Sequence, residues 1–245
     1  MNQIRVMVFP GAQNLPLWMM DHIELRYTKS RDDQIAAIQD GAVDIIHTSP
    51  DNLSLPDAQG ISAFLAGTVG PLELVMTNRE EPQILAVDNP RSGFGRLAYK
   101  WLREHLPDMP YQVFEAGGTP QRFQALRTGQ ATLAVMHPPF TEFCKDAGYT
   151  ILGRIDIGYP TLCGVCRTEL LKTERVKTYK VSYRNVIDRL ADAQGTQLAR
   201  EVMAKNLPDI PGDTRDKMAD IMREEVIAAG VEFDPDTLTK LRDLT

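Results

Sequence analysis

The sequence predicts an α/β fold of mainly parallel sheets with flanking helices, completed by a helical C-terminal wrap. Short apolar runs rich in valine, isoleucine and leucine alternate with helix-periodic stretches over the first two thirds of the chain. Polar loops directly follow several of these runs. Beyond about residue 168 the strand-like runs cease and helical periodicity continues. This order is typical of strands joined by covering helices.

The expected strands are short apolar runs, and the expected helices carry their apolar residues at helical spacing. The strands are Ile4–Phe9, Ile23–Tyr27, Val43–Ile46, Ile61–Ala66, Leu72–Met76, Ile84–Val87, Tyr111–Phe114, Leu133–Met136 and Leu162–Val165. The helices among them are Arg31–Gln39, Ser92–His105, Thr119–Thr128 and Pro139–Ala147. The helices of the tail are Arg167–Leu190, Thr196–Asn206, Asp213–Ala229 and a short one from Pro235 capped by Asp234.

Composition excludes several classes of function. The 245 residues are 43% hydrophobic and carry a net charge of -6, which disfavours nucleic acid or an anionic membrane surface as a partner. No apolar run approaches the ~20 residues needed to span a bilayer, so no membrane insertion is expected. Residues 1–9 have the pattern of a strand and not of a signal peptide. A cytoplasmic location is expected for the sequence as written, and a periplasmic one if it is a trimmed mature form.

Five loops stand out because each directly follows an expected strand. They read PGAQNLPLW at 10–18, HTSPDN at 47–52, DNPRSGFG at 88–95, AGGTPQR at 116–122 and MHPPF at 136–140. Ligands of open α/β sheets bind beyond the carboxyl ends of the strands, where these loops lie. The loops are therefore the candidate ligand-binding segments.

The order and wording of these loops resemble the substrate-binding proteins of nitrate, sulfonate and taurine-type ABC importers, a family that includes thiamine-pyrimidine synthases. The resemblance runs from Ile4 to the helical tail. It implies a two-lobed type II periplasmic-binding-protein fold, with lobe one formed by residues 1–82 plus 162–245 and lobe two by 83–161. It further implies a cleft between the lobes for a small organic molecule, a transporter permease as partner, and no cofactor.

Two of the loops have the features of helix starts that hold an anion. In AGGTPQR, Thr119 suits the N-cap, Pro120 suits the first helical position, and Arg122 lies in the first turn. In DNPRSGFG, Ser92 is the expected cap and Gly93 lets the backbone approach closely. Amides at a helix start favour a carboxylate, sulfonate or phosphate. The alternative, that both are simply well-capped helices, stays open.

Two histidines follow strands of different lobes. His47 and His137 can serve as hydrogen-bond donors to a ligand or as an acid/base pair with Asp51. Both can equally be structural residues. No metal site is expected, because two histidines need a further ligand and only Asp51 is spaced closely with one of them.

The remaining candidates complete a polar site with an aromatic wall. Phe9 and Trp18 can stack on a planar ligand or pack in the core. The expected ligand-binding residues are Phe9, Gln13, Asn14, Trp18, His47, Thr48, Ser49, Asn52, Asn89, Ser92, Gly93, Gly118, Thr119, Arg122 and His137.

The pair Cys163 and Cys166 does not predict a redox or metal site. Residues three apart in a strand point to opposite faces of the sheet, so the two thiols diverge.

Lobe one looks thinned relative to the family. Only Met19–Asp21 stands where family members carry a full helix, and Asn78–Gln83 replaces a longer helical excursion. A partner, including a second copy of the chain, can cover the face left open.

Three functions remain open at this point. A solute receptor needs only a complementary cleft that closes on its ligand. A cytosolic lyase on the same fold, such as a decarboxylase or dehydratase of a small carboxylic acid, needs His47, His137 or Asp51 within reach of a reacting atom. A regulatory ligand-sensing module is the third.

Overall fold

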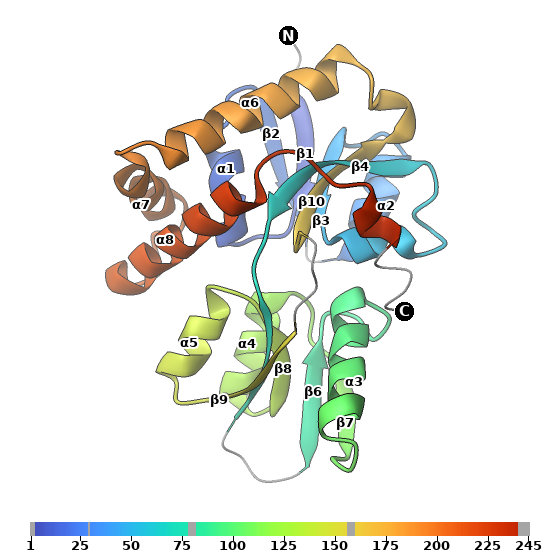
Figure 1. The fold of residues 1–245 in the computed structure, drawn as a ribbon, viewed down its shortest axis with the longest axis vertical. Helices are drawn as coiled ribbons and strands as arrows, with labels where there is room; N and C mark the ends of the chain where they lie inside the picture. The colour runs from blue at the N-terminus through green and yellow to red at the C-terminus, as the bar shows by residue number, and fades with distance from the viewer. Residues whose placement is uncertain (1–2, 29, 78–81, 156–159, 240–245) are drawn as a thin grey trace. The chain divides into compact units, whose positions relative to one another are not determined.

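The computed structural model describes residues 3–28, 30–77, 82–155 and 160–239 (Figure 1). The chain divides into two compact units. Unit 1 comprises Met1–Val69 and Tyr159–Leu241, and unit 2 comprises Gly70–Gly158. The expected first boundary lay near residue 82, so the strand at Leu72–Met76 joins unit 2 in the structure and not lobe one as expected.

Unit 1 is built on a five-stranded sheet with the order β2-β1-β3-β10-β4. Its strands are β1 (Ile4–Val8), β2 (Ile23–Tyr27), β3 (Ile45–Thr48), β4 (Ile61–Thr68) and β10 (Leu162–Arg167). β1 pairs in parallel with β2 and β3, whereas β10 pairs antiparallel with β3 and β4. The strands β2, β1 and β3 are therefore parallel, and β10 runs in the opposite direction to both of its neighbours.

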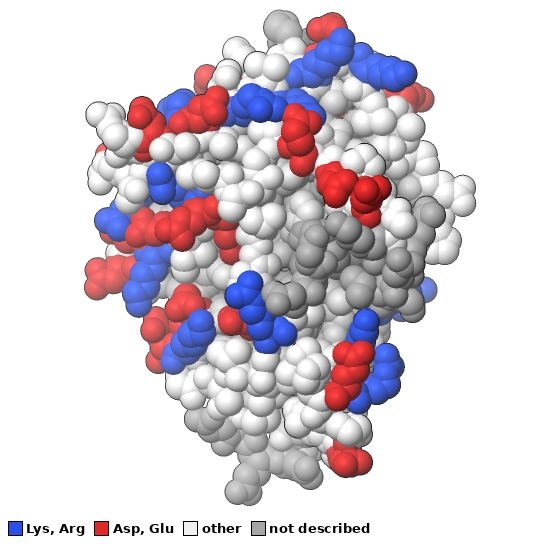
Figure 2. Space-filling model, viewed as in Figure 1, with Lys and Arg blue, Asp and Glu red and all other residues white. Residues whose placement is uncertain are grey.

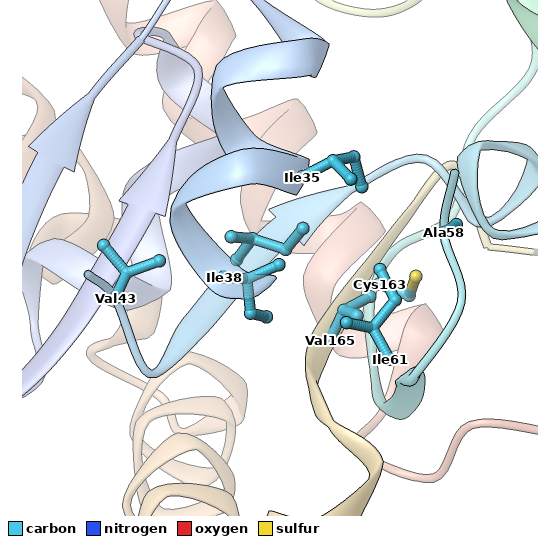
Figure 3. Close-up of a cluster of buried hydrophobic side chains, with 8 residues drawn as sticks. Ile35, Ile38, Val43, Ala58, Ile61, Cys163 and Val165 are labelled. Atoms are coloured by element: carbon cyan, nitrogen blue, oxygen red, sulfur yellow. The ribbon is translucent and has the colours of Figure 1, made fainter. Parts of the chain in front are cut away.

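One face of this sheet is covered by α2 (Arg31–Gln39), whose start is capped by Ser30. Figure 3 shows the cluster that joins them, with Ile35 and Ile38 of the helix against Cys163 and Val165 of β10. Cys163 and Val165 lie on the same face of β10, because successive side chains of a strand alternate between the two faces of the sheet. Burying this cluster fixes the register of β10 in the sheet.

The C-terminal tail packs onto unit 1 as helices, as the sequence predicts. Its elements are η3 (Thr168–Leu170), α6 (Glu174–Ala191), α7 (Gly195–Asn206) and α8 (Gly212–Ala229), followed by a turn of helix at 236–239 that begins after Asp234. Tyr179 and Tyr183 of α6 are fully buried. The long helix begins at Glu174, later than the expected Arg167, because β10 extends to that arginine.

Unit 2 repeats the plan with the strand order β7-β6-β8-β5-β9. Its strands are β5 (Leu72–Met76), β6 (Gln83–Val87), β7 (Tyr111–Glu115), β8 (Leu133–Met136) and β9 (Thr150–Ile155). Its helices are α3 (Gly93–His105), α4 (Thr119–Thr128) and α5 (Phe140–Asp146). β6 again pairs in parallel with two neighbours, and β5 pairs antiparallel with two. Strand β9 is absent from the sequence prediction.

The surface carries both signs of charge side by side. Figure 2 shows acidic and basic side chains next to one another over the helical tail, where Lys180 and Arg184 of α6 both pair with Glu232. Within the described residues, no helix is long and apolar enough to cross a membrane. Residues 78–81 of the shortened segment Asn78–Gln83 lie outside the described part of the chain.

Candidate functional site

The loop after β3 forms a compact polar turn in unit 1. Thr48, at the end of the strand, accepts a hydrogen bond from the Asn52 side chain at 2.8 Å. Ser49 donates to the carboxylate of Asp51 within η2 (Pro50–Ser54). All four side chains belong to buried residues. The structure therefore brings together Thr48, Ser49, Asp51 and Asn52, which the sequence had selected.

The loop after β1 is folded around one carbonyl. The side-chain amides of Gln13 and Asn14, in η1 (Ala12–Asn14), donate to the oxygen of Phe9 at 3.1 and 2.8 Å. Gly11 has a φ of 150°, and a β-carbon there would collide with the Gln13 side chain. A glycine is thus required for Gln13 to fold back over the loop.

Trp18, expected beside the ligand, is placed differently. It ends α1 (Leu15–Trp18), and its Nε1 donates to the hydroxyl of Tyr27 at 2.9 Å. Tyr27 belongs to β2, the edge strand of the sheet. The indole therefore holds the short helix against the edge of the sheet.

His47 faces the helical tail. It lies within β3, one residue beyond the expected strand end at Ile46, and its Nε2 is 2.8 Å from the hydroxyl of Tyr179. Its ring also stands 6.0 Å from that of Tyr183. Burial lowers the pKa of His47 to about 4, so the imidazole is neutral at pH 7. These contacts are those of a packed structural residue, and Tyr179 is the partner that the sequence did not identify.

At the start of α3, nearby side chains accept hydrogen bonds from the backbone amides. Ser92 caps the helix by accepting from the Gly95 amide at 3.0 Å, as predicted, and it donates its own proton to the carboxylate of Asp88. The side chain of Asn89 accepts from the Arg91 amide at 2.8 Å in the same turn. Asp88, four residues before the cap, was not among the candidates. An acidic residue therefore already occupies this helix start.

The start of α4 is different, and it corrects the predicted cap. The N-cap is Gly118 and not Thr119, which is the first helical residue, and no side chain caps this helix. Gly118 has extended backbone angles, and Gly117 before it has a φ of 97°. The double glycine thus turns the chain into the helix one residue earlier than the threonine pattern indicates.

Arg122 is buried directly behind this helix start. Its guanidinium donates to the carbonyl oxygens of Val135 and Gly117 at 3.0 and 3.1 Å, and to the hydroxyl of Thr119 at 2.8 Å. Burial lowers the pKa of Arg122, while the nearby Asp88 carboxylate raises it. The side chain therefore supplies positive charge to the site, and each of its three nitrogens donates to an acceptor within the protein.

The hydroxyl of Thr119 links Arg122 to His137. Nδ1 of His137 lies 2.7 Å from the carbonyl oxygen of Pro138, so Nδ1 carries the proton and donates. Burial lowers the pKa of His137 to about 4, and the ring is therefore neutral. Nε2 is left as an acceptor, and the Thr119 hydroxyl donates to it at 2.9 Å. A directed chain runs from Arg122 through Thr119 and His137 to Pro138.

The cysteines take no part in either loop cluster. Cys163 and Cys166 are free, and each is buried, with the pKa of Cys166 raised to about 12 by burial. Cys163 lies in the cluster under α2. Among the described residues, no three histidine, cysteine or acidic side chains stand close enough to hold a metal ion.

No protein-family model matches the sequence, and no curated protein is similar to it. Solved structures do match over the whole chain. The ligand-binding component of an ABC-type import system from Staphylococcus aureus, solved with zinc bound, is 16% identical, covers 100% of this chain and 91% of its own, and has a TM-score of 0.77. The aliphatic sulphonate binding protein SsuA from Escherichia coli is 11% identical, with coverages of 100% and 85% and a TM-score of 0.71.

A third match extends the set beyond bacteria. A Candida albicans protein, described as exhibiting the generic periplasmic-binding-protein fold, is 12% identical over 100% of this chain and 89% of its own, with a TM-score of 0.72. Identities this low establish architecture and leave ligand and partner undetermined. The fold predicted from the order of the loops is confirmed: the chain has the periplasmic-binding-protein fold.

Proposed function

We propose that this chain is a solute-binding protein whose ligand is a small organic anion held at the start of α4. The observation that carries this proposal is the start of α4, a helix of ten residues. Its N-cap is a glycine, no side chain caps it, and a buried arginine lies directly behind it. Backbone amides at such a position carry a partial positive charge and point out of the helix.

The chemistry of this helix start selects the ligand class. The amides of Thr119 and Gln121 precede the first intrahelical bond, in which Arg122 donates to Gly118 at 3.0 Å, and Pro120 between them has no amide proton. Two donors and a fixed positive charge suit a carboxylate, sulfonate or phosphate. Arg122 acts through its charge, because its nitrogens already have acceptors.

The start of α3 is a weaker place for an anion. Asp88 stands next to its cap and repels a second negative group, and Asn89 and Ser92 are committed to the same turn. We therefore assign the anionic group to α4.

The same contacts favour binding over acid–base catalysis. His47 is occupied by Tyr179, and both nitrogens of His137 are engaged. A general acid or base needs a nitrogen within hydrogen-bond reach of a reacting atom and a pKa near the working pH. Neither histidine meets these needs, so the lyase alternative receives no support from the geometry. A transporter permease is the partner proposed for a receptor of this kind.

The experiment is calorimetry with a panel of probes: ethanesulfonate, taurine, acetate, phosphate and nitrate. At least one probe is expected to bind the wild-type chain and to be recovered unchanged by mass spectrometry. Thr119→Pro removes one amide donor together with the hydroxyl that contacts Arg122 and His137, and it is expected to weaken that binding roughly 10- to 100-fold. Thr119→Ser retains the amide and the hydroxyl, and its affinity is expected to stay within about twofold of wild type.

Three outcomes contradict the proposal. The first is that no probe binds at millimolar concentration. The second is that Thr119→Pro, shown to be folded by circular dichroism, binds the probe as wild type does. The third is chemical conversion of the bound probe, which favours the enzyme.

A further inference from the structure

Strand β2 forms an edge of the unit 1 sheet. Within the described residues it pairs with β1 and with no other strand. Its register with β1 is continuous over Ile23–Tyr27, and it contains neither proline nor a bulge. Proline and bulges are two of the devices that prevent pairing at a sheet edge, and an edge strand without them has a regular backbone that can pair with another strand.

The hydrogen bonds to β1 determine which backbone groups are turned outward. The Ile4 amide donates to the His22 carbonyl, and the Thr28 amide donates to the Val8 carbonyl, each at 3.0 Å. In a parallel pair the residues of one strand point alternately to the partner and away from it. Glu24 and Arg26 therefore face β1 with their backbone groups. The amides and carbonyls of Ile23, Leu25 and Tyr27 point to the open edge.

The side chains of β2 divide into an apolar and a charged face. Ile23, Leu25 and Tyr27 share one face, on which Tyr27 accepts a hydrogen bond from Trp18 of α1 and is 53% exposed. Glu24 and Arg26 share the other face, where they form an ion pair at 2.8 Å with both side chains more than two fifths exposed. The edge thus offers an apolar stripe and a charged stripe on either side of the same open backbone.

We propose that β2 pairs antiparallel with β2 of a second copy of this chain, around a twofold axis at Leu25. This register sets Glu24 opposite Arg26 of the partner subunit, and Arg26 opposite Glu24 of the partner subunit. Leu25 then faces its own counterpart, and Ile23 faces Tyr27 of the partner subunit. Opposite charges and apolar pairs directly across an antiparallel ladder stabilise it.

The backbone supports the same register. Leu25 and the two pairs of Ile23 with Tyr27 become the hydrogen-bonded pairs, because their amides and carbonyls point outward. Glu24 and Arg26 fall at the non-hydrogen-bonded positions, where side chains of opposite strands are closest. A twofold interface requires a patch that complements itself. The sequence Ile-Glu-Leu-Arg-Tyr meets this requirement, because residues at equal distances on either side of the central leucine are either both apolar or of opposite charge.

The edge of unit 2 lacks this self-complementarity. If β7 paired antiparallel with β7 of a second copy around a twofold axis at Val113, Tyr111 would stand opposite Glu115 and Gln112 opposite Phe114. No opposite charges would then meet. Val113 is 43% exposed and lies at the centre of an edge strand of equal length. β7 therefore provides the matched control.

The experiment measures molar mass by sedimentation equilibrium on the full chain. The wild type is expected at twice the 27.4 kDa of one chain at tens of micromolar. Glu24→Arg sets arginines against each other in both cross-strand pairs and is expected to weaken the dimer roughly 10- to 100-fold. Adding Arg26→Glu to Glu24→Arg restores opposite charges across the interface and is expected to restore the dimer.

A backbone variant tests the register independently of charge. Leu25→Pro removes an outward amide and leaves the β1 ladder intact, so the chain is expected to become monomeric while remaining folded by circular dichroism. Val113→Pro makes the same change in β7 and is expected to remain dimeric. A monomeric wild type, a Glu24→Arg or Leu25→Pro variant that is folded and dimeric, or a monomeric Val113→Pro variant would each overturn the proposal.

Discussion

The two sheets are built to one plan, and each carries a histidine at the carboxyl end of its central strand. β3 and β8 occupy the same place in the strand orders of unit 1 and unit 2. His47 lies inside β3 and contacts Tyr179 of α6. His137 follows the last residue of β8 and contacts Thr119 at the start of α4.

The two histidines differ by two positions along the strand, since His47 stands one residue before the end of β3 and His137 one residue after the end of β8. Within a strand the side chain must take one face of the sheet, and the face open to His47 is covered by the tyrosines of the tail. Beyond the strand end the backbone is free to turn, and His137 turns toward the neighbouring helix start. The residue type alone therefore does not distinguish a packing histidine from one at a candidate ligand site.

The largest expected effect concerns the packing side of this comparison. Tyr179→Ala removes a fully buried ring from the tail of unit 1 and leaves His47 without its partner, which is expected to cost about 3–5 kcal/mol of unfolding free energy. Tyr179→Phe keeps the ring and is expected to cost about 1–2 kcal/mol. Urea unfolding followed by circular dichroism measures both. A Tyr179→Phe variant as stable as the wild type would contradict a hydrogen bond to His47.

The next effect is a loss of stability in acid. The pKa of His47 is about 4 in the folded chain, below the ordinary value of 6.5. Between these values the unfolded chain binds a proton that the folded chain does not, so the unfolding free energy falls as pH drops from about 6.5 to 4, by roughly 3 kcal/mol for this histidine. Urea titrations at pH 7, 5.5 and 4.5 test it. His47→Gln should reduce the dependence by roughly half, because His137, whose pKa is also about 4, keeps its own share, and an unchanged slope would exclude His47 as a source.

Glu225 of α8 is expected to lower stability as pH rises, which is the opposite of the effect of His47. Its carboxyl oxygen Oε1 is buried without a partner among the described residues, and burial raises its pKa to about 8. The unfolded chain ionises this group from pH 4.5 upward while the folded chain keeps the proton, so stability falls as pH rises from 4.5 to 8. Glu225→Gln is expected to gain about 1–2 kcal/mol at pH 8 and nothing at pH 4.5. A gain that is equal at both pH values would contradict the buried acid.

A smaller effect is expected at the candidate ligand site. Thr119→Val removes the hydroxyl between Arg122 and His137, leaves one donor and one acceptor unpaired, and is expected to cost about 1 kcal/mol. Nitrogen NMR of His137 reports the same change, because the neutral ring with its proton on Nδ1 loses the hydrogen bond to Nε2. Thr119→Ser is the control and should keep the wild-type spectrum. A His137 spectrum that Thr119→Val leaves unchanged would exclude the link.

Local patterns predicted the elements well wherever local forces decide them. The expected bounds of α2, α4, β2, β5 and β8 match the structure, because caps, apolar periods and strand-forming residues act over a few residues. β9 was missed because its sequence includes Gly153, which weakens a strand pattern. The glycine is needed for a distant reason, since a β-carbon there would collide with the ring of Trp101 in α3.

The sequence selected residues that lie together at the start of α4, but it did not predict where their side chains point. Thr119, Arg122 and His137 were all selected, yet Arg122 was expected to reach a ligand, and its nitrogens bind Val135, Gly117 and Thr119. His47 was expected to face a ligand, and Tyr179, far along the chain, holds it instead. Contacts between distant residues set these directions, and a single sequence carries no signal for them.

The smallest expected effect compares the two helix starts of unit 2. Ser92 and Gly118 have nearly the same backbone angles at their caps, with φ of -65° and -60°, but only the serine side chain accepts a helix amide. Gly118→Ser is therefore expected to add a cap to α4, directed at the Gln121 amide because Pro120 has none, and to gain a few tenths of a kcal/mol. The same hydroxyl competes with an anion for that amide. The proposed ligand is therefore expected to bind more weakly, while the free energy of unfolding rises slightly. Paired urea titrations and calorimetry on wild type and Gly118→Ser measure the two changes, and a variant that gains stability while binding the anion equally well would place the ligand elsewhere than at this helix start.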